Sequence, residues 1–498
     1  MNSAPRATDR TSPVASVHLL RQILSFPVML AGLLTVLAVF TVRNRFNDLD
    51  MWWHLKTGEI IWNTHTIPTA DLFSFTTNHH AWVPHEWLAQ LLIYSAYRWG
   101  SYTGLMLWLC FFTAVLLISG YVLCSLYSGN SKTAFLGALV IWLFVTSSLA
   151  IRPQVIGYLF LIVELLFVHL GRTRSSRWFF ALPPLFALWV NCHGSFFLGL
   201  LLLGLFLFCS FFDFQMGLLV SSGLDPHRRR MLTLALLLSI AALFLNPIGI
   251  KQVLYPVDTL LHQHIVTSQI EEWKPLLLSS PRGLALYAVL GCIFLMLIVQ
   301  RSELHWDELL TLILGTALAL NHQRMATVFG ILAAPTLSRL LSTSWDSYNV
   351  EQDHQWANAV LITTSLVIVF LTFPNRQFLA RQVEGGNPVG AVAFIKENHL
   401  HGNMLNAFDY GGYLIWALPE QPVFVDGRAD VFEWSGVLGQ FSEWATLQSD
   451  PNALLDKYDI SFCLLERESL MAHVMPLVPG WKALYSDNLS VIFVRSAP

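Results

Sequence analysis

Residues 47–55 read Asn-Asp-Leu-Asp-Met-Trp-Trp-His-Leu and follow directly on an apolar run at 24–43. Asp48 and Asp50 stand one residue apart, beside two Trp residues and His54, where a membrane helix would emerge into water. Charged groups at a membrane edge must be solvated, paired or bound to a cation. The stretch therefore predicts a functional site at the membrane edge, with an ordinary interfacial charge as the alternative.

The composition around this stretch is that of a membrane protein. Of 498 residues, 54% are hydrophobic and 12% are charged, and the mean hydropathy is +0.53. Soluble domains are less apolar and carry more charge. The formal net charge of -3 gives no basic surface, so nucleic acid is not expected as a partner. The six cysteines show neither a disulfide framework nor the spacing of zinc ligands.

Eleven apolar runs are candidates to cross about 30 Å of hydrocarbon. They occur at 24–43, 103–127, 133–150, 154–170, 178–190, 195–213, 231–246, 284–300, 308–320, 325–341 and 357–373. Arg clusters at 172–177 and 228–230 lie in short connectors, which favours the cytoplasm for them and for the Arg-bearing N-terminus. We therefore expect a polytopic α-helical membrane protein of about 11 spans whose C-terminal part lies on the opposite, extracytoplasmic face.

The hydropathy profile divides the chain into four segments. We expect a cytoplasmic tail at 1–23, a transmembrane domain at 24–373 with a first outer loop at 44–102, a linker at 374–386 and a small extracytoplasmic α/β domain at 387–498. The α/β domain is predicted from an Asn-Pro helix start at 387–388 and from short β-rich runs. These runs are 404–408, 423–426, 461–465, 483–485 and 490–495.

Polar side chains gather on the face that the topology places outside. They come from the first outer loop, from later outer connectors and from two strand ends of the tail, where loops often form binding sites. As candidate substrate-binding residues we take His54, His85, Arg152, His193, Glu271, Glu272, Arg324, Asp409, Tyr410, Asp426 and Arg428. Each motif alone also fits a helix cap or a tight turn. Their common face favours a site.

Several strings resemble the C-type glycosyltransferase (GT-C) superfamily of polyprenyl-phosphate-dependent membrane enzymes, and within it a bacterial branch. They are Asp50-Met-Trp-Trp-His-Leu-Lys-Thr-Gly58, Pro68-Thr-Ala-Asp-Leu-Phe-Ser74, Trp82-Val-Pro-His-Glu-Trp-Leu88, Trp189-Val-Asn-Cys-His-Gly194 and Asp426-Gly-Arg428. The resemblance implies a GT-C-like transmembrane domain in the bacterial inner membrane, with the lipid bilayer and a polyprenyl-phosphate-linked sugar donor as partners. The acceptor is left open.

The resemblance also implies roles for single residues. An acidic residue of the first outer loop, matched here by Asp50 or Asp48, acts on the acceptor or binds a metal; Glu86 is a supporting catalytic candidate. No cofactor is firmly indicated, and a divalent metal ion would be held by Asp48 and Asp50 if by any residues. Arg152 and Arg324 are candidate phosphate clamps, since guanidinium groups donate paired hydrogen bonds to phosphate.

One string resembles a known motif only in part. Asp409-Tyr410-Gly411 is similar to the end of the Trp-Trp-Asp-Tyr-Gly motif of oligosaccharyltransferases, but Ala407-Phe408 stands in place of the two Trp residues. The loop between the third and fourth predicted spans also lacks a second Asp-x-Asp pair. Both departures argue against a peptide acceptor and a metal site of the oligosaccharyltransferase kind.

Three classes of function stay open on the sequence. The first is a membrane glycosyltransferase that moves a sugar from a polyprenyl-phosphate donor to an acceptor at the extracytoplasmic face. The second is a noncatalytic membrane protein whose outer domain binds glycan or a protein partner. The third is a transporter, which needs charged or broken helices near the midplane; Glu164, the carboxylate deepest in a predicted span, is the candidate for that role.

Overall fold

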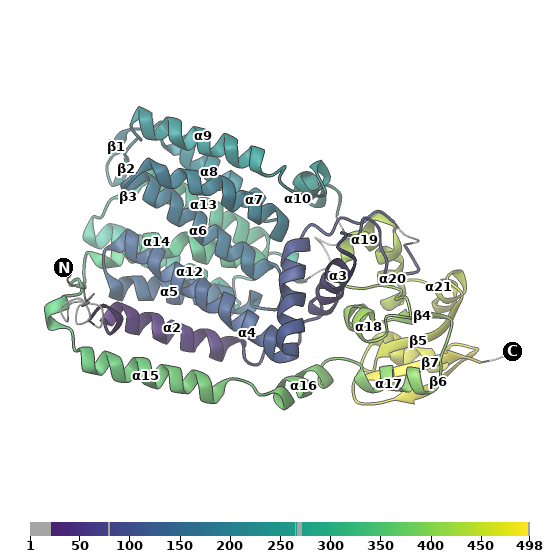
Figure 1. Ribbon diagram of the computed structural model, residues 1–498. Helices are drawn as coiled ribbons and strands as arrows, with labels where there is room; N and C mark the ends of the chain where they lie inside the picture. Colours follow the sequence, from purple (N-terminus) through teal and green to yellow (C-terminus); the bar gives the residue numbers. More distant parts are fainter. Residues whose placement is uncertain (1–20, 78–79, 264, 266–270, 497–498) are drawn as a thin grey trace, which may run out of the picture.

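A long helical bundle carries a smaller α/β domain at one end in the computed structural model (Figure 1), which describes residues 21–77, 80–263, 265 and 271–496. The predicted N-terminal tail therefore lies almost wholly outside the described residues. In the bundle, α2 and α15 lie side by side, and α15 then leads through α16 into the α/β domain (Figure 1).

Each of the eleven predicted apolar runs contains a bundle helix. These helices are α2 (Phe26–Val42), α4 (Trp87–Ser128), α5 (Ser131–Val145), α6 (Gln154–Thr173), α7 (Leu182–Cys192), α8 (Phe196–Cys209), α9 (Pro226–Ala242), α12 (Pro281–Gln300), α13 (Trp306–Asn321), α14 (Ala326–Ser342) and α15 (Gln355–Thr372). Of the described segments, 6 helices are long and apolar enough to cross a membrane, and α2 and α8 are shorter apolar helices. The chain is a multi-pass membrane protein whose helices differ in length.

Further short elements complete the bundle. They are α3 (Met51–Thr64), α10 (Ile250–His262), the 3-10 turns η1 (Thr146–Ser148), η2 (Ser176–Ala181), η3 (Glu271–Trp273), η4 (Gln323–Met325) and η5 (Val350–Gln352), and the strands β1 (Phe214–Met216), β2 (Leu219–Ser221) and β3 (Leu304–His305). The three strands form a small sheet at the end of the bundle away from the α/β domain (Figure 1). By contrast, α3 and α10 lie at the end that faces this domain (Figure 1).

Helix α4 is broken where the predicted first outer loop ends. Ser101 has φ 54° and ψ -138°, a backbone conformation that no helix tolerates. Beyond the break the chain returns so closely that a Cβ on Gly104 would lie 2.0 Å from the carbonyl oxygen of Ala96. Residues 87–100 therefore form a separate helical arm, which packs on α3.

The α/β domain, called the tail domain below, runs from Val389 to Arg495. Its elements are α17 (Val389–Glu397), β4 (Asn403–Asn406), η6 (Phe408–Tyr410), α18 (Gly411–Ala417), α19 (Ala429–Trp434), α20 (Val437–Ala445), α21 (Pro451–Lys457), β5 (Ile460–Glu466), α22 (Leu470–Val474), η7 (Met475–Leu477), β6 (Trp481–Ser486) and β7 (Ser490–Arg495), preceded by α16 (Arg376–Glu384). The sheet has the order β4-β5-β7-β6, with β4 parallel to β5 and the other pairs antiparallel.

The prediction of a strand at 423–426 is wrong. The backbone of this segment forms its hydrogen bonds with a side chain and with the first loop, and not with a neighbouring strand of the sheet. The side-chain oxygen of Asn406 accepts from Phe424 N at 2.8 Å, and its amide donates to Val425 O at 2.8 Å. On the other side, Val423 N donates to Phe73 O at 2.9 Å. The segment is buried like a strand but ties the first loop, the stretch between α2 and α4, to the tail domain.

One hydrophobic core runs through the bundle and the tail domain without a break. Trp52 of α3 is fully buried at the contact and meets Tyr102 and Tyr413 edge-on, with ring centroids 6.3 and 5.1 Å apart. Large aromatic side chains contribute most to such contacts. The motif at 47–55 is therefore fixed between the two parts of the molecule.

Candidate active site between the bundle and the tail domain

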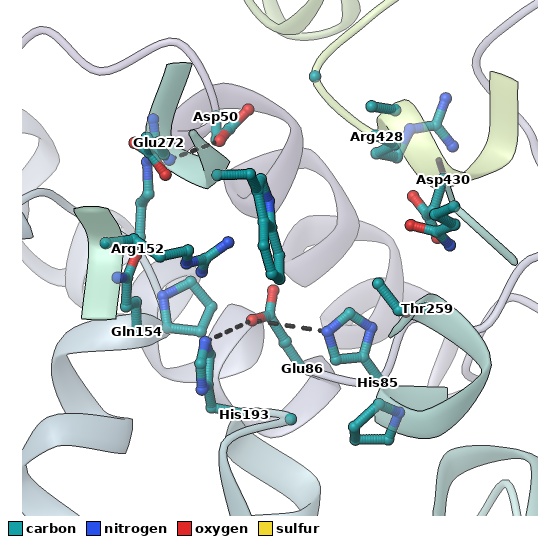
Figure 2. Close-up of a pocket in the computed structure, with 18 of the residues that line it drawn as sticks. Asp50, His85, Glu86, Arg152, Gln154, His193, Thr259, Glu272, Arg428 and Asp430 are labelled. Carbon is teal, nitrogen blue, oxygen red and sulfur yellow. Dashed lines mark hydrogen bonds and ion pairs between the residues drawn. The ribbon is translucent and has the colours of Figure 1, made fainter. Parts of the chain in front are cut away.

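A cavity of about 880 Å³ opens where the first loop, the bundle and the tail domain meet. Its polar wall includes Asp50, Glu86 and Arg152, and Figure 2 shows these side chains pointing into it. An apolar wall continues along α6 and α8 through Leu161 and Leu198. The volume and mixed lining are typical of a small-molecule site.

The two carboxylates of the opening motif have different surroundings. Asp48 Oδ1 accepts hydrogen bonds from the backbone N–H of Asp50 at 3.1 Å and of Met51 at 3.2 Å, and so supports the start of α3. Its two oxygens also accept from Arg152 Nε at 2.8 and 2.9 Å. Asp48 is not among the described residues that line the cavity, whereas Asp50 is. The structure thus separates a supporting carboxylate from an accessible one.

Asp50 is held in place from three sides. Its Oδ2 lies 2.9 Å from Arg152 Nη1, and its Oδ1 accepts from Trp53 Nε1 at 3.1 Å. A Cβ on Gly427 of the tail domain would come within 2.0 Å of Asp50 Oδ1, so only glycine allows this approach. Burial, opposed by Arg152 and reinforced by Asp48, raises the pKa of Asp50 to about 6. The tail domain thus closes directly over the candidate catalytic group.

Arg428 forms a buried ion cluster behind this contact. Its Nη2 lies 2.6 Å from Asp426 Oδ2, and its Nη1 lies 2.5 Å from Asp71 Oδ1 in the first loop. Phe73 and Trp82 cover the guanidinium at 4.7 and 4.8 Å. Burial disfavours charge here, yet Arg428 and hydrogen bonds from neighbouring hydroxyls lower the pKa of Asp71 to about 2. Arg428 therefore joins the first loop to the tail domain.

Glu86 lies between histidine side chains deeper in the cavity (Figure 2). Its oxygens are 3.6 Å from His193 Nε2, 3.7 Å from His85 Nε2 and 3.8 Å from His54 Nδ1. The three histidines come from the end of α7, from the residue before Glu86 and from α3. The sequence prediction that these four residues share one site is consistent with this arrangement.

Arg324 and Arg152 both line the cavity but differ in their partners. Arg152 contacts three carboxylates. Its Nε pairs with Asp48, and its Nη1 lies 2.9 Å from Asp50 Oδ2 and 3.4 Å from Glu272 Oε1. Arg324 stacks over Trp273 at 4.5 Å and forms no ion pair with any residue that the structure describes. Arg324 is therefore the cation better placed to receive an anion.

The remaining predicted residues divide between the cavity and the protein interior. Glu271, Glu272, Asp409 and Arg428 line the cavity. Asp426 and Tyr410 are absent from the lining that the described residues form; the hydroxyl of Tyr410 donates to Leu489 O at 2.8 Å.

Sequence reasoning missed two cavity residues that contact each other. Tyr255 of α10 donates a hydrogen bond to Asp430 Oδ2 at 3.1 Å, and Asp430 ends the Asp-Gly-Arg-Ala-Asp string at 426–430. That string was the available signal for Asp430. Glu164 lies outside the cavity lining, as far as the chain is described.

The site was also tested for a metal centre. Within the described ranges, no three or more His, Cys, Asp or Glu side chains are grouped so that they could hold a metal ion. Asp48 and Asp50, the sequence candidates, instead face the guanidinium of Arg152. The described side chains do not fit a bound metal ion.

No protein-family model and no curated protein matches this sequence, but solved structures share its fold. The oligosaccharyltransferase AglB of Archaeoglobus fulgidus in its apo form gives a TM-score of 0.53 at 12% identity, over 88% of this chain and 69% of that one. ArnT of Cupriavidus metallidurans, bound to undecaprenyl phosphate, gives 0.53 at 10% identity over 98% and 100%. The chain has the GT-C fold.

A mycobacterial arabinofuranosyltransferase, AftD, extends the GT-C comparison. It gives a TM-score of 0.52 at 12% identity over 94% of this chain and 41% of that one. The resemblance stated from the sequence strings is thereby confirmed for the fold. At such identities the comparison carries the GT-C architecture alone, so the chemistry has to be argued from the side chains of the cavity.

Proposed function

We propose that this protein is a membrane glycosyltransferase. It transfers a sugar from a polyprenyl-phosphate donor to an acceptor at the extracytoplasmic face of a bacterial inner membrane. The observation that carries the proposal is the meeting of three features in one cavity: the half-buried carboxylate of Asp50, the cation Arg324, which forms no ion pair with a described residue, and an apolar wall. A lipid-linked sugar phosphate needs a site for its lipid chain, one for its phosphate and a group that accepts the proton, and the cavity contains side chains suited to each of them.

The phosphate is bound by Arg324. Its guanidinium is free of ion pairs with the described residues and is fixed by its stack on Trp273. Guanidinium groups bind phosphate oxygens with paired hydrogen bonds. Arg152 acts differently, because Asp48 and Asp50 already accept from its Nε and Nη1. We assign Arg152 to orienting the two carboxylates.

The polyprenyl chain lies along the apolar wall. Leu161 of α6 and Phe197, Leu198 and Leu201 of α8 line the cavity on the side of the bundle. Phe197 and Leu201 are also exposed on the surface of the bundle, and in a membrane that surface meets lipid. The donor can therefore enter from the bilayer while its phosphate reaches the polar wall.

Asp50 is the proton acceptor of the transfer step. The acceptor hydroxyl oxygen attacks the anomeric carbon, and the bond from that carbon to the phosphate oxygen breaks. The bonding electrons leave with polyprenyl phosphate, whose charge Arg324 stabilises. The hydroxyl proton passes to Asp50. Burial moves the pKa of Asp50 up to about 6, closer to neutral, which suits a general base.

Replacing Arg324 by Gln tests the phosphate site. With the protein in nanodiscs, we expect undecaprenyl phosphate to bind about 10- to 100-fold more weakly, since a charge-assisted hydrogen-bond pair is lost. The matched control is Arg98→Gln, because Arg98 also stacks on a Trp ring, Trp62, at 5.0 Å, but does not line the cavity. Equal affinities of the two variants would refute the phosphate assignment.

A further inference from the structure

Glu86 is buried in the cavity wall, yet its carboxylate makes only long contacts with the described side chains. The residue is 8% exposed and lines the cavity. The imidazole nitrogens of His193, His85 and His54 approach it to 3.6, 3.7 and 3.8 Å, each beyond hydrogen-bond distance. No described residue donates a hydrogen bond to its oxygens. Buried polar groups are almost always satisfied, so this side chain is available to a ligand in the cavity.

The hydrogen bonds of two of these histidines fix their tautomers. The backbone N–H of Ser195 donates to His193 Nδ1 at 3.1 Å, so the neutral ring carries its proton on Nε2. The carbonyl oxygen of Val83 can only accept, so His85 Nδ1, 3.4 Å away, carries the proton and Nε2 has the lone pair. Nε2 of both rings faces Glu86 Oε1. We call the part of the cavity around Glu86, His54, His85 and His193 the recess. It presents a donor, His193 Nε2, on one side of Glu86 and an acceptor, His85 Nε2, on the other.

Burial, more than the surrounding charges, keeps the carboxyl group of Glu86 protonated. Burial, then the charge of Asp50, raises the pKa of Glu86 to about 8; Arg324 and Arg152 oppose the shift, and Asp430 adds to it.

The histidines facing Glu86 are neutral as well. Burial lowers the pKa of His85 to about 4 and of His193 to about 3, and it lowers the pKa of His54 well below its usual value. Tyr255, which stacks on His85 at 3.8 Å, stays protonated because burial raises its pKa. At neutral pH the recess thus holds the carboxylic acid of Glu86 and three uncharged imidazole rings.

We propose that Glu86 forms with His85 and His193 a subsite that binds a hydroxyl group of an uncharged sugar ring. A hydroxyl both donates and accepts, and so matches a donor and an acceptor on either side of it. A charged group would find no counter-ion among these three residues. Trp53 and Trp82 also line the cavity, and the ring of Trp53 lies against that of His54, with centroids 3.6 Å apart.

The inference rests on the proposed glycosyl transfer and adds the substrate class bound beside the phosphate. It also changes the role of Glu86, which was a supporting catalytic candidate on the sequence. A group that is protonated at neutral pH cannot take up the proton of the acceptor hydroxyl. The base remains Asp50, and Glu86 becomes a hydrogen-bond donor to the substrate.

The test compares Glu86→Gln and Glu86→Ala with the wild-type protein in nanodiscs. Gln keeps a neutral donor in place of the acid, whereas Ala removes it. The probes are undecaprenyl phosphate, a set of undecaprenyl-phosphate-linked neutral hexoses, and the matching methyl glycosides. The control is Glu59→Gln, because Glu59 pairs with Lys56 on α3 and does not line the cavity. The quantity measured is the gain in affinity due to the sugar.

At pH 6.5 we expect the sugar to improve wild-type binding about tenfold over the bare lipid phosphate, the size of one or two net hydrogen bonds. Glu86→Gln and the control keep this gain, and Glu86→Ala loses it. Because the raised pKa of Glu86 makes the acid the dominant form below about pH 8, the wild-type gain falls at pH 9. The Gln variant keeps it at both pH values.

The two sources of a sugar hydroxyl give different results. Dependence on Glu86 seen with the lipid-linked hexoses places the donor sugar in the recess, and dependence seen only with the methyl glycosides places the acceptor there. The proposal is overturned if the Gln variant loses as much as the Ala variant, if the wild-type gain rises with pH, or if no sugar improves binding. Binding of bare undecaprenyl phosphate, which depends on Arg324, is judged separately and tests the proposed function.

Discussion

Replacing Arg428 by Met is expected to lower the free energy of unfolding by about 3–5 kcal/mol, the usual cost of breaking a buried ion pair from one side. Both carboxylates that Arg428 neutralises, Asp71 and Asp426, are 0% exposed, and Met cannot replace the charge. The change also frees the first loop from the tail domain. Thermal and denaturant unfolding of the purified protein, followed by tryptophan fluorescence, measures the loss.

The pH dependence of this defect has a defined sign. Without Arg428, burial raises the pKa of Asp71 in the folded state above its unfolded value. A raised carboxyl pKa costs stability that grows as pH rises above the unfolded pKa, so the deficit should be smaller at pH 5 than at pH 8. Adding Asp71→Asn and Asp426→Asn should restore part of the stability. A deficit that is the same at both pH values would contradict the assignment to buried charge.

A surface ion pair provides the matched control. Arg495 Nη2 lies 2.7 Å from Asp456 Oδ1, about the same distance as in the buried cluster, but the two side chains are 41% and 61% exposed. Exposed pairs contribute about 0–1 kcal/mol because water screens them. Arg495→Met should therefore change unfolding little. A loss comparable with that of Arg428→Met would mean that burial does not explain the difference.

The helices could be predicted from the sequence because their signal is local. The longer apolar runs require a helix in lipid, where backbone groups must bond within their own segment. The same profile could not give the break at Ser101, because the residues on both sides are compatible with a helix. The predicted strand at 423–426 failed for a related reason. The sequence correctly indicated that this segment is buried. Its hydrogen-bond partners, Asn406 and Phe73, come from other parts of the fold and could not be predicted.

The part of the site that could be predicted from the sequence consists of residues at helix ends. Asp50, Glu86 and His193 each lie at such an end, and the topology placed these ends on one face. The pairing of Asp71 with Arg428 gave no signal, because the two residues are 357 positions apart in the sequence. The difference between Asp48 and Asp50 was equally hidden. It depends on which carboxylate supports the start of α3 and which faces the cavity.

Replacing Asp50 by Asn is expected to lower turnover by about 10²- to 10⁴-fold, the usual contribution of a general base. Asn is nearly isosteric and can still accept the hydrogen bond from Trp53 Nε1, so the fold and the affinity for undecaprenyl phosphate should persist. Turnover is measured as release of undecaprenyl phosphate from undecaprenyl-phosphate-linked hexoses in proteoliposomes supplied with a cell-envelope extract. Unfolding temperature is measured on the same preparations.

Asp48→Asn is the matched control for that experiment, since Asp48 binds the same arginine but stands outside the described cavity lining. Asn at this position still accepts from the N–H groups at the start of α3, so we expect a loss of no more than about tenfold, through a less firmly held Arg152. The two variants change charge identically, so a difference between them isolates the proton transfer. If both lose turnover equally, or if Asp50→Asn keeps it, Asp50 is not the base. A noncatalytic binding protein would show no turnover to lose and would keep its ligand affinity in both variants.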